Sequence, residues 1–236
     1  MSAFLYGTLL QFKMDIRSRS LLVTCYLVPL LFFAIMGNIF TALMPQSRDA
    51  LIQSMTVMGV SMGAGVPPVL VEIYGTDVRK MYQAGGAPLC FGLLSMLLSA
   101  FLHLLIMSGI IFAAAEALFD AKVPEHLPGY FLTLALFIGA SLSLAAVLGL
   151  LVKSQAKLTM YCQLLFLPSI MLSGIMFPAQ LLPDALEKLG RLFPATWGYQ
   201  LLGGGEAELS GYALLLTVLA GAAGLCCLLL RRSRCT

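Results

Sequence analysis

The chain alternates between long apolar segments and short stretches that hold most of its charged residues. A helix needs about 20 consecutive apolar residues to cross the hydrocarbon core of a bilayer. Six segments reach or approach that length: 21–43, 55–73, 89–115, 130–152, 158–177 and 212–230. The pattern predicts an all-α membrane protein with six transmembrane helices.

The second segment is the least regular of the six because it is rich in glycine and continues past two prolines. Gly59 and Gly63 have the spacing that lets membrane helices approach one another closely. This spacing fits packing within the chain or an interface between subunits. Pro67 and Pro68 predict a kink, which membrane helices tolerate.

An amphipathic helix is predicted ahead of the first span, over residues 2–19. Apolar residues recur at helical spacing and polar residues punctuate the other side. The apolar set is Leu5, Leu9, Phe12 and Ile16, and the polar set is Gln11, Lys13 and Asp15. We expect this helix to lie in the inner membrane interface and to lead into the first span. A plain cytoplasmic extension of that span is the alternative.

The distribution of basic residues sets the expected orientation. With six spans both termini lie on one side, and that side holds ten of the 14 lysines and arginines. The positive-inside rule therefore places both termini in the cytoplasm and the chain in the cell membrane, plasma or inner. Composition agrees with a lipid environment, since 60% of the residues are hydrophobic and 11% are charged. Soluble domains contain about 25% charged residues.

Residues that usually carry chemistry are sparse. The sequence contains no phosphate-binding loop of the form GxxxxGK[ST], no HExxH motif and no cluster with metal-ligand spacing. We therefore expect no catalysis, cofactor, metal or nucleic-acid partner. The six cysteines fall in spans or on the cytoplasmic side, so no disulfide framework is expected. His103, deep in the third span, fits either a proton relay or a neutral imidazole that is hydrogen-bonded between helices.

The cytoplasmic loop over residues 72–86 has the features of a short capped helix. Thr76 or Asp77 is suited to cap its start, Arg79 and Lys80 follow, and two glycines at positions 85 and 86 end it. Two interpretations stay open. The loop is a docking knob for a soluble partner, or it is a solvated positive loop that only sets the orientation of the chain.

A second polar stretch, over residues 178–208, lies between the fifth and sixth spans. It contains several charges and the prolines Pro178, Pro183 and Pro194. Short, broken helices at membrane depth are tolerated only where protein or a water-filled cavity covers them. The stretch therefore predicts a re-entrant helical hairpin followed by a loop on the outer face.

Both stretches resemble those of type-2 ATP-binding-cassette (ABC-2 type) export permeases, and the resemblance covers the whole chain. In that family the first stretch is the helix that couples the permease to its ATPase. The residues that would have this role are Glu72, Tyr74, Gly75, Thr76, Asp77, Arg79 and Lys80. The outer hairpin would contain Ser173, Gly174, Phe177, Pro178, Pro183 and Pro194.

The resemblance implies a membrane-spanning exporter subunit. It would act as a homodimer or heterodimer in the lipid bilayer, with cytoplasmic nucleotide-binding ATPase subunits that bind the ATP and Mg²⁺. The cargo would be a hydrophobic or amphipathic drug, antibiotic, peptide or lipid-linked molecule, for which methionines and aromatic side chains offer adaptable contacts. The candidate path contains Phe33, Asn38, Met58, Met62, Tyr161 and Gln163. Ordinary packing or lipid contact is the alternative for each of these side chains.

Two other classes of function are compatible with the sequence. A secondary transporter or channel would work without ATP, although such proteins usually need charged groups inside the membrane, and the spans contain few. A non-transporting membrane scaffold would tolerate substitutions in the hairpin as long as the chain still inserts.

Overall fold

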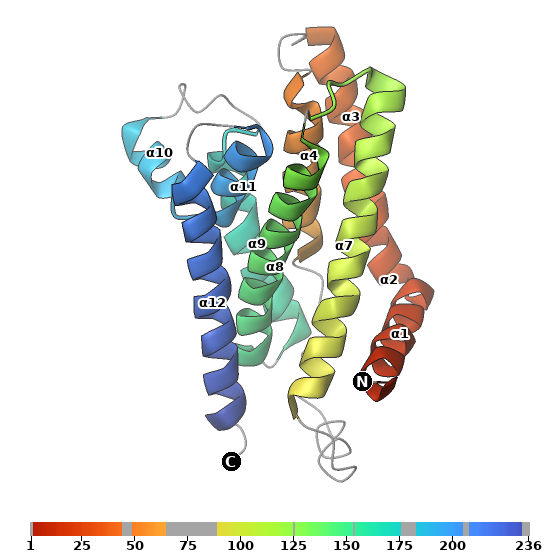
Figure 1. Ribbon diagram of the computed structural model, residues 1–236, viewed down its shortest axis with the longest axis vertical. Coiled ribbons are helices and arrows are strands. Elements are labelled where there is room, and N and C mark those ends of the chain that lie inside the picture. The colour runs from red at the N-terminus through yellow and green to blue at the C-terminus, as the bar shows by residue number, and fades with distance from the viewer. Residues whose placement is uncertain are drawn as a thin grey trace.

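The computed structural model is a bundle of helices whose long members run side by side (Figure 1). It describes residues 2–43, 49–64, 89–124, 126–152, 154–175, 183–204 and 208–232. All regular structure in these residues is helical, so the all-α prediction is confirmed for them. The start of α1 (Ser2–Arg17) and the end of α12 (Glu208–Arg232) lie at the same end of the bundle, as an even number of spans requires.

The helices between these two correspond in order to the predicted segments. They are α2 (Arg19–Leu22), the π-helix η1 (Val23–Leu27), α3 (Val28–Leu43), α4 (Leu51–Ala64), α7 (Leu89–Phe119), α8 (Leu127–Leu151), α9 (Gln155–Leu172), α10 (Asp184–Gly190) and α11 (Pro194–Leu202). Four segments are long and apolar enough to cross a membrane: Val23–Ala42, Phe91–Phe119, Leu127–Leu151 and Leu209–Arg231. Within the described residues α4 and α9 are shorter, so the number of six spans stays a prediction.

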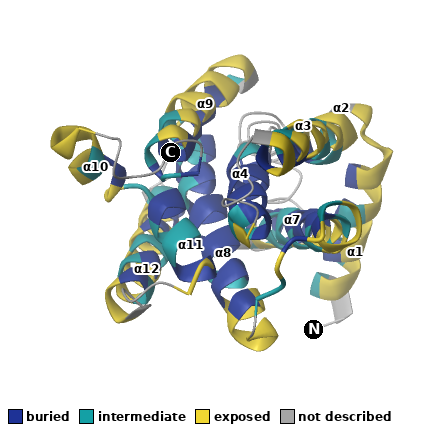
Figure 2. Ribbon diagram, turned by 90° about the horizontal axis from the view of Figure 1, so that it is seen from above, coloured by how far each residue is buried: buried dark blue, intermediate teal, exposed yellow. Residues whose placement is uncertain are grey.

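The short helix α4 lies at the centre of the bundle. Twelve of its 14 residues are buried. It packs against α3 and α7 on one side and against α8, α9 and α11 on the other, as the end-on view shows (Figure 2). A helix that has apolar or small residues on every side is suited to such a position. The helix is therefore held by side chains from most of the other elements.

Two glycines bring α4 close to α7. A Cβ atom added to Gly63 would lie 2.4 Å from Cδ2 of Leu104, and one added to Gly59 would lie 2.9 Å from Cε of Met107. These two side chains occupy the space that the glycines leave, which is the usual role of small residues between membrane helices. The structure thus supports the interpretation of this glycine pair as a packing contact within the chain.

The first span contains a widened turn. Pro29 has no N–H group, and its ring crowds the carbonyl four residues earlier, so a regular helical turn is disfavoured there. The chain forms the π-helix η1 instead, in which the N–H of Val28 donates to the carbonyl of Val23. Within this turn the Tyr26 hydroxyl lies 2.7 Å from Nδ1 of His103 on α7. A hydrogen bond between His103 and a neighbouring helix, one of the two interpretations of this residue, is therefore present, and a role as a proton relay stays a prediction.

The helix α1 confirms the predicted N-terminal helix and turns two of its polar residues, Gln11 and Asp15, inward. The Asp15 side chain is only 6% exposed; its carboxylate accepts hydrogen bonds from Gln11 Nε2 at 2.9 Å and from Ser99 Oγ on α7 at 2.5 Å. Phe12 stacks on His103 with a centroid distance of 4.4 Å. The apolar Leu9, by contrast, is 66% exposed. This inside-out arrangement suits a helix whose outer face meets lipid and not water; an interfacial position in a membrane stays a prediction.

Candidate functional site

The residues expected to couple the chain to an ATPase lie outside the described residues. They are Glu72, Tyr74, Gly75, Thr76, Asp77, Arg79 and Lys80, all within 65–88. The described chain shows only what flanks this segment. It leaves the buried helix α4 at Ala64 and enters α7 at Leu89. The coupling role of these residues stays a prediction.

The predicted outer hairpin begins where α9 ends. Ser173 Oγ donates to the carbonyl of Ile170, and Gly174 takes a positive φ of 88°, which favours glycine. Phe177 and Pro178 lie outside the described residues. The chain then forms two short helices: Pro183 immediately precedes α10, and Pro194 is the first residue of α11. Proline suits these positions because the first N–H groups of a helix have no partner within it.

The turn between α10 and α11 is fixed by hydrogen bonds to its backbone. Thr196 Oγ1 donates to the carbonyl of Gly190 at 2.6 Å, and Trp197 Nε1 donates to the carbonyl of Arg191 at 2.7 Å. Gly190 is also pressed against α9, since an added Cβ would lie 2.6 Å from the carbonyl oxygen of Leu172. These contacts confirm two short helices here. Re-entry of the hairpin into a membrane is not tested by them.

The two helices of the hairpin differ in burial. Most of α11 is buried against α12, α8 and α4, whereas α10 is largely exposed and packs against α9. Gly198 allows α11 to approach α8, because an added Cβ would lie 2.7 Å from the Phe137 ring. The hairpin is thus anchored in the bundle through α11. We refer to the end of the bundle that carries α10 and α11 as the hairpin end.

The six candidate path residues fall into two groups. On the inside, Phe33 and Met58 are almost fully buried, and Met62 is partly buried; Phe33 packs edge-on against Phe119 with a centroid distance of 5.4 Å. The others are exposed: Asn38, Tyr161 and Gln163. The structure therefore does not bring all six together. A path that uses Phe33 or Met58 would require movement of the helices that cover them, and its lining stays a prediction.

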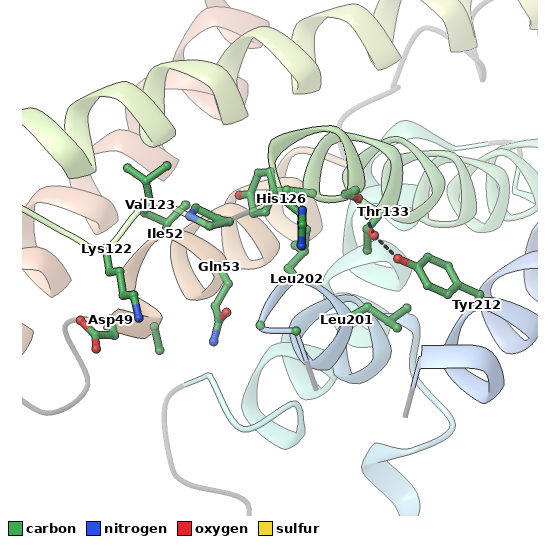
Figure 3. Close-up of a pocket in the computed structure, with 16 residues that line it drawn as sticks. Asp49, Ile52, Gln53, Lys122, Val123, His126, Thr133, Leu201, Leu202 and Tyr212 are labelled. Carbon is green, nitrogen blue, oxygen red and sulfur yellow. Dashed lines mark hydrogen bonds between the residues drawn. The ribbon is translucent and has the colours of Figure 1, made fainter. Parts of the chain in front are cut away.

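A cavity of about 600 Å³ opens at the hairpin end. Its walls come from the start of α4, the α7–α8 connection, the first turns of α8, the end of α11 and the start of α12 (Figure 3). The described residues that line it are Asp49, Ala50, Ile52, Gln53, Lys122, Val123, Pro124, His126, Gly129, Tyr130, Thr133, Leu201, Leu202, Gly203, Gly204 and Tyr212. The cavity thus lies between elements that are far apart in the sequence.

Hydroxyl groups in the cavity wall join α8 to its neighbours. Tyr130 donates its hydroxyl hydrogen to Thr56 Oγ1 on α4 at 3.0 Å. Thr133 Oγ1 donates to the carbonyl of Gly129, and it also lies 2.6 Å from the Tyr212 hydroxyl on α12. Because a hydroxyl has one hydrogen, Tyr212 is the donor in this second contact. Both tyrosine oxygens therefore keep the capacity to accept a further hydrogen bond.

The rim of the cavity carries two opposite charges. Asp49 and Lys122 both lie at one edge of the cavity (Figure 3). Among the described residues the one ion pair is that of Glu187 with Arg191 on the hairpin, at 2.7 Å, so Asp49 and Lys122 are not ion-paired there. A short turn shapes the adjoining wall: Gly203 abuts Gln53, since an added Cβ would lie 2.8 Å from Oε1 of that side chain.

Neither the cavity nor the buried position of the Asp15 carboxylate was predicted from the sequence. The cavity residues come from five separate elements, and no local motif connects them. For Asp15 a signal was present, because Gln11 and Asp15 are one helical turn apart and Ser99 is a polar residue inside a predicted span. Pairing polar residues of separate apolar helices is the step that would have found this contact.

Comparisons with known proteins identify the family. A search of curated proteins gave no match. The family model described as ABC-2 type transporter matches residues 3–206, which extend from the second residue of α1 to just beyond α11. This match, together with four helices that are long and apolar enough to cross a membrane, identifies a membrane-embedded transporter permease. The chain belongs to the ABC-2 type transporter family.

Proposed function

We propose that this chain is the membrane-spanning subunit of an ATP-driven exporter in the cell membrane. The observation that carries the proposal is the family match over residues 3–206 of a helical, largely apolar chain. The sequence has no phosphate-binding loop, so ATP and Mg²⁺ would bind to separate cytoplasmic ATPase subunits. Two permease subunits, identical or different, would form the transport unit.

The position of α4 supports a mechanical role for the segment that follows it. α4 contacts α3, α7, α8, α9 and α11, and its C-terminal end leads into residues 65–88. A force that reaches the end of α4 at Ala64 would be carried toward the hairpin end by a packed helix. Packed interiors transmit such displacements because they have few voids to absorb them. ATP binding and hydrolysis on the partner would then bias the permease between two arrangements.

The cargo class follows from the surfaces that the chain offers. The exposed side of α9 carries Met160, Tyr161, Leu164 and Met171, which suit contact with an apolar molecule or with lipid acyl chains. Within the described residues the spans contain few charged groups to attract a free ion. We therefore propose a hydrophobic or amphipathic cargo such as a drug, antibiotic, peptide or lipid-linked molecule, moved from the cytoplasm or inner leaflet.

Co-purification tests the proposal directly. The tagged chain would be purified in mild detergent, its partners identified, and the eluate assayed for ATP hydrolysis. We expect a stoichiometric nucleotide-binding subunit with activity. Bulky apolar replacements at Gly75, Thr76 and Asp77 should weaken its binding while membrane insertion is kept. The control is Lys157→Leu, an exposed basic residue at the start of α9. A chain that purifies alone, and is inactive in lipid nanodiscs, would favour a secondary transporter or a scaffold instead.

A further inference from the structure

We propose that the cavity at the hairpin end binds the polar head of an amphipathic molecule that carries both a primary ammonium and a phosphate-like anion. The inference relies on the proposed function only in taking this end of the bundle as the outer one, where lipid headgroups lie. Binding itself requires neither ATP nor a partner subunit. The volume of the cavity, about 600 Å³, is within the range of about 300–1,000 Å³ that is usual for small-molecule sites.

The two charges on the rim favour a ligand that has both signs. Asp49 and Lys122 face the cavity from different elements and are not joined in an ion pair. A purely anionic ligand would gain from Lys122 but be repelled by Asp49, and a purely cationic ligand would meet the reverse. A ligand with an anion and an ammonium satisfies both groups, and it adds no net charge to the site.

Hydrogen-bonding capacity indicates a primary and not a quaternary ammonium. The Tyr130 and Tyr212 hydroxyls already donate their hydrogens to threonines, so they offer only acceptor oxygens. Tyr212 lies at the other end of the cavity from Asp49 (Figure 3), so one ammonium does not reach both. The Asp49 carboxylate is itself an acceptor, to which a primary ammonium can donate N–H hydrogen bonds, whereas a quaternary ammonium has none to donate. The carboxylate therefore favours an ethanolamine-like head over a choline-like one.

The remaining wall is apolar and suits the attachment point of a hydrophobic tail. Ile52, Val123, Leu201 and Leu202 line the cavity beside the polar groups. Ligand sites commonly combine such an apolar wall with a few placed polar groups. A lipid with a phosphoethanolamine head has this combination, and so has a soluble phosphoethanolamine compound. Both share the chemistry that the cavity recognises.

Native mass spectrometry of the purified full chain measures this selectivity. The protein would be titrated with dihexanoyl phosphatidylethanolamine, phosphatidylcholine and phosphatidylglycerol. We expect roughly tenfold tighter binding of the ethanolamine lipid than of the other two, the ratio that one charge-assisted hydrogen bond typically gives. Equal binding of all three by the unmodified protein would overturn the proposal without the need for any variant.

Two substitutions separate the effects of Asp49 and Lys122 on lipid binding. Asp49→Asn should remove the preference for ethanolamine, because it removes the charge that attracts the ammonium. Lys122→Gln should weaken all three lipids and leave the preference in place, since each lipid has a phosphate. The matched control is Glu187→Gln with Arg191→Gln, an exposed ion pair outside the cavity. If the variant that combines Asp49→Asn with Lys122→Gln keeps the full preference for the ethanolamine lipid, the cavity is not the binding site.

A last arm of the experiment identifies the source of the ligand. Glycerophosphoethanolamine, which has the same head and no acyl chains, would be titrated in parallel. If glycerophosphoethanolamine binds as tightly as the lipid, the ligand is a soluble compound. If its affinity is lower by about tenfold or more, the ligand is a lipid. Both results keep the recognition chemistry. Because this assay uses the chain alone, it can fail while the ATPase partner is found, or succeed while none is found.

Discussion

Replacement of Ser99 by alanine should loosen the contact between α1 and α7. Ser99 Oγ donates to Asp15 Oδ2 at 2.5 Å, and the Asp15 side chain is only 6% exposed. Hydrogen bonds to charged groups contribute about 1.5–3 kcal/mol to stability. The Gln11 amide still donates to the other carboxylate oxygen in the variant. We therefore expect Ser99→Ala to lower the free energy of unfolding by about 1.5–2 kcal/mol, at the lower end of this range.

The matched control is Ser95→Ala, one helical turn earlier on the same helix. Ser95 is also buried, but its hydroxyl donates at 3.1 Å to the carbonyl of Gly92 within α7. Removing this local bond should cost about 0.5 kcal/mol or less, because the carbonyl remains in the helical hydrogen-bond ladder. The difference between the two variants isolates the contact with α1.

The assay is thermal unfolding in mild detergent, followed with a dye that reacts with thiols as they become accessible. Cys25, Cys162 and Cys226 are free and buried, so unfolding exposes them. For a chain of this length about 1 kcal/mol shifts Tm by about 2–4 °C, so Ser99→Ala should lower Tm by about 3–8 °C. Equal shifts for both serine variants would refute the reasoning. So would strict additivity of Asp15→Asn and Ser99→Ala, which share one hydrogen bond.

Three further predictions concern other parts of the fold. Gly190→Ala should destabilise the hairpin by about 1–3 kcal/mol, because its Cβ would lie 2.6 Å from the last carbonyl of α9; an unchanged Tm would contradict this close contact. Tyr26→Phe should cost about 0.6–1.7 kcal/mol by removing the 2.7 Å hydrogen bond to His103, and the same substitution in a His103→Phe background should then cost little. A cysteine at Asp184 should react with an impermeant thiol reagent added outside, and one at Arg79 should not; the opposite labelling would reverse the orientation.

The helices could be predicted from the sequence because their signal is local. Each apolar segment has a helix at its place within the described residues, and prolines and glycines mark the ends of the short helices α10 and α11. Which side of a helix faces inward is a different question. In α1 the apolar Leu9 is exposed and the polar Asp15 is buried, the reverse of the pattern in a water-soluble protein. That arrangement depends on the solvent around the helix and on a polar partner, Ser99, that is 84 residues away.

The candidate path residues also show that the sequence did not predict which side chains are buried. Residue type alone grouped the buried Met58 with the exposed Gln163, because both lie in spans and both suit an adaptable surface. Burial separates them. The cavity at the hairpin end is the converse case, since its rim brings together Asp49 and Lys122 from two connections that no sequence pattern relates. Sites formed by loops of a packed bundle are determined by tertiary contacts, and local periodicity does not predict them.

The burial of α4 has a consequence for how a permease of this kind can change its cargo. A side chain with neighbours on every side has little freedom to vary, since a larger residue is overpacked and a smaller one leaves a cavity. Twelve of the 14 residues of α4 are in that position. The exposed side chains of α9, such as Tyr161 and Gln163, carry no such constraint. Directed evolution toward a new cargo should therefore accumulate substitutions on α9 first. A substitution in α4 should appear only together with a second one, at a neighbouring residue, that restores the packing.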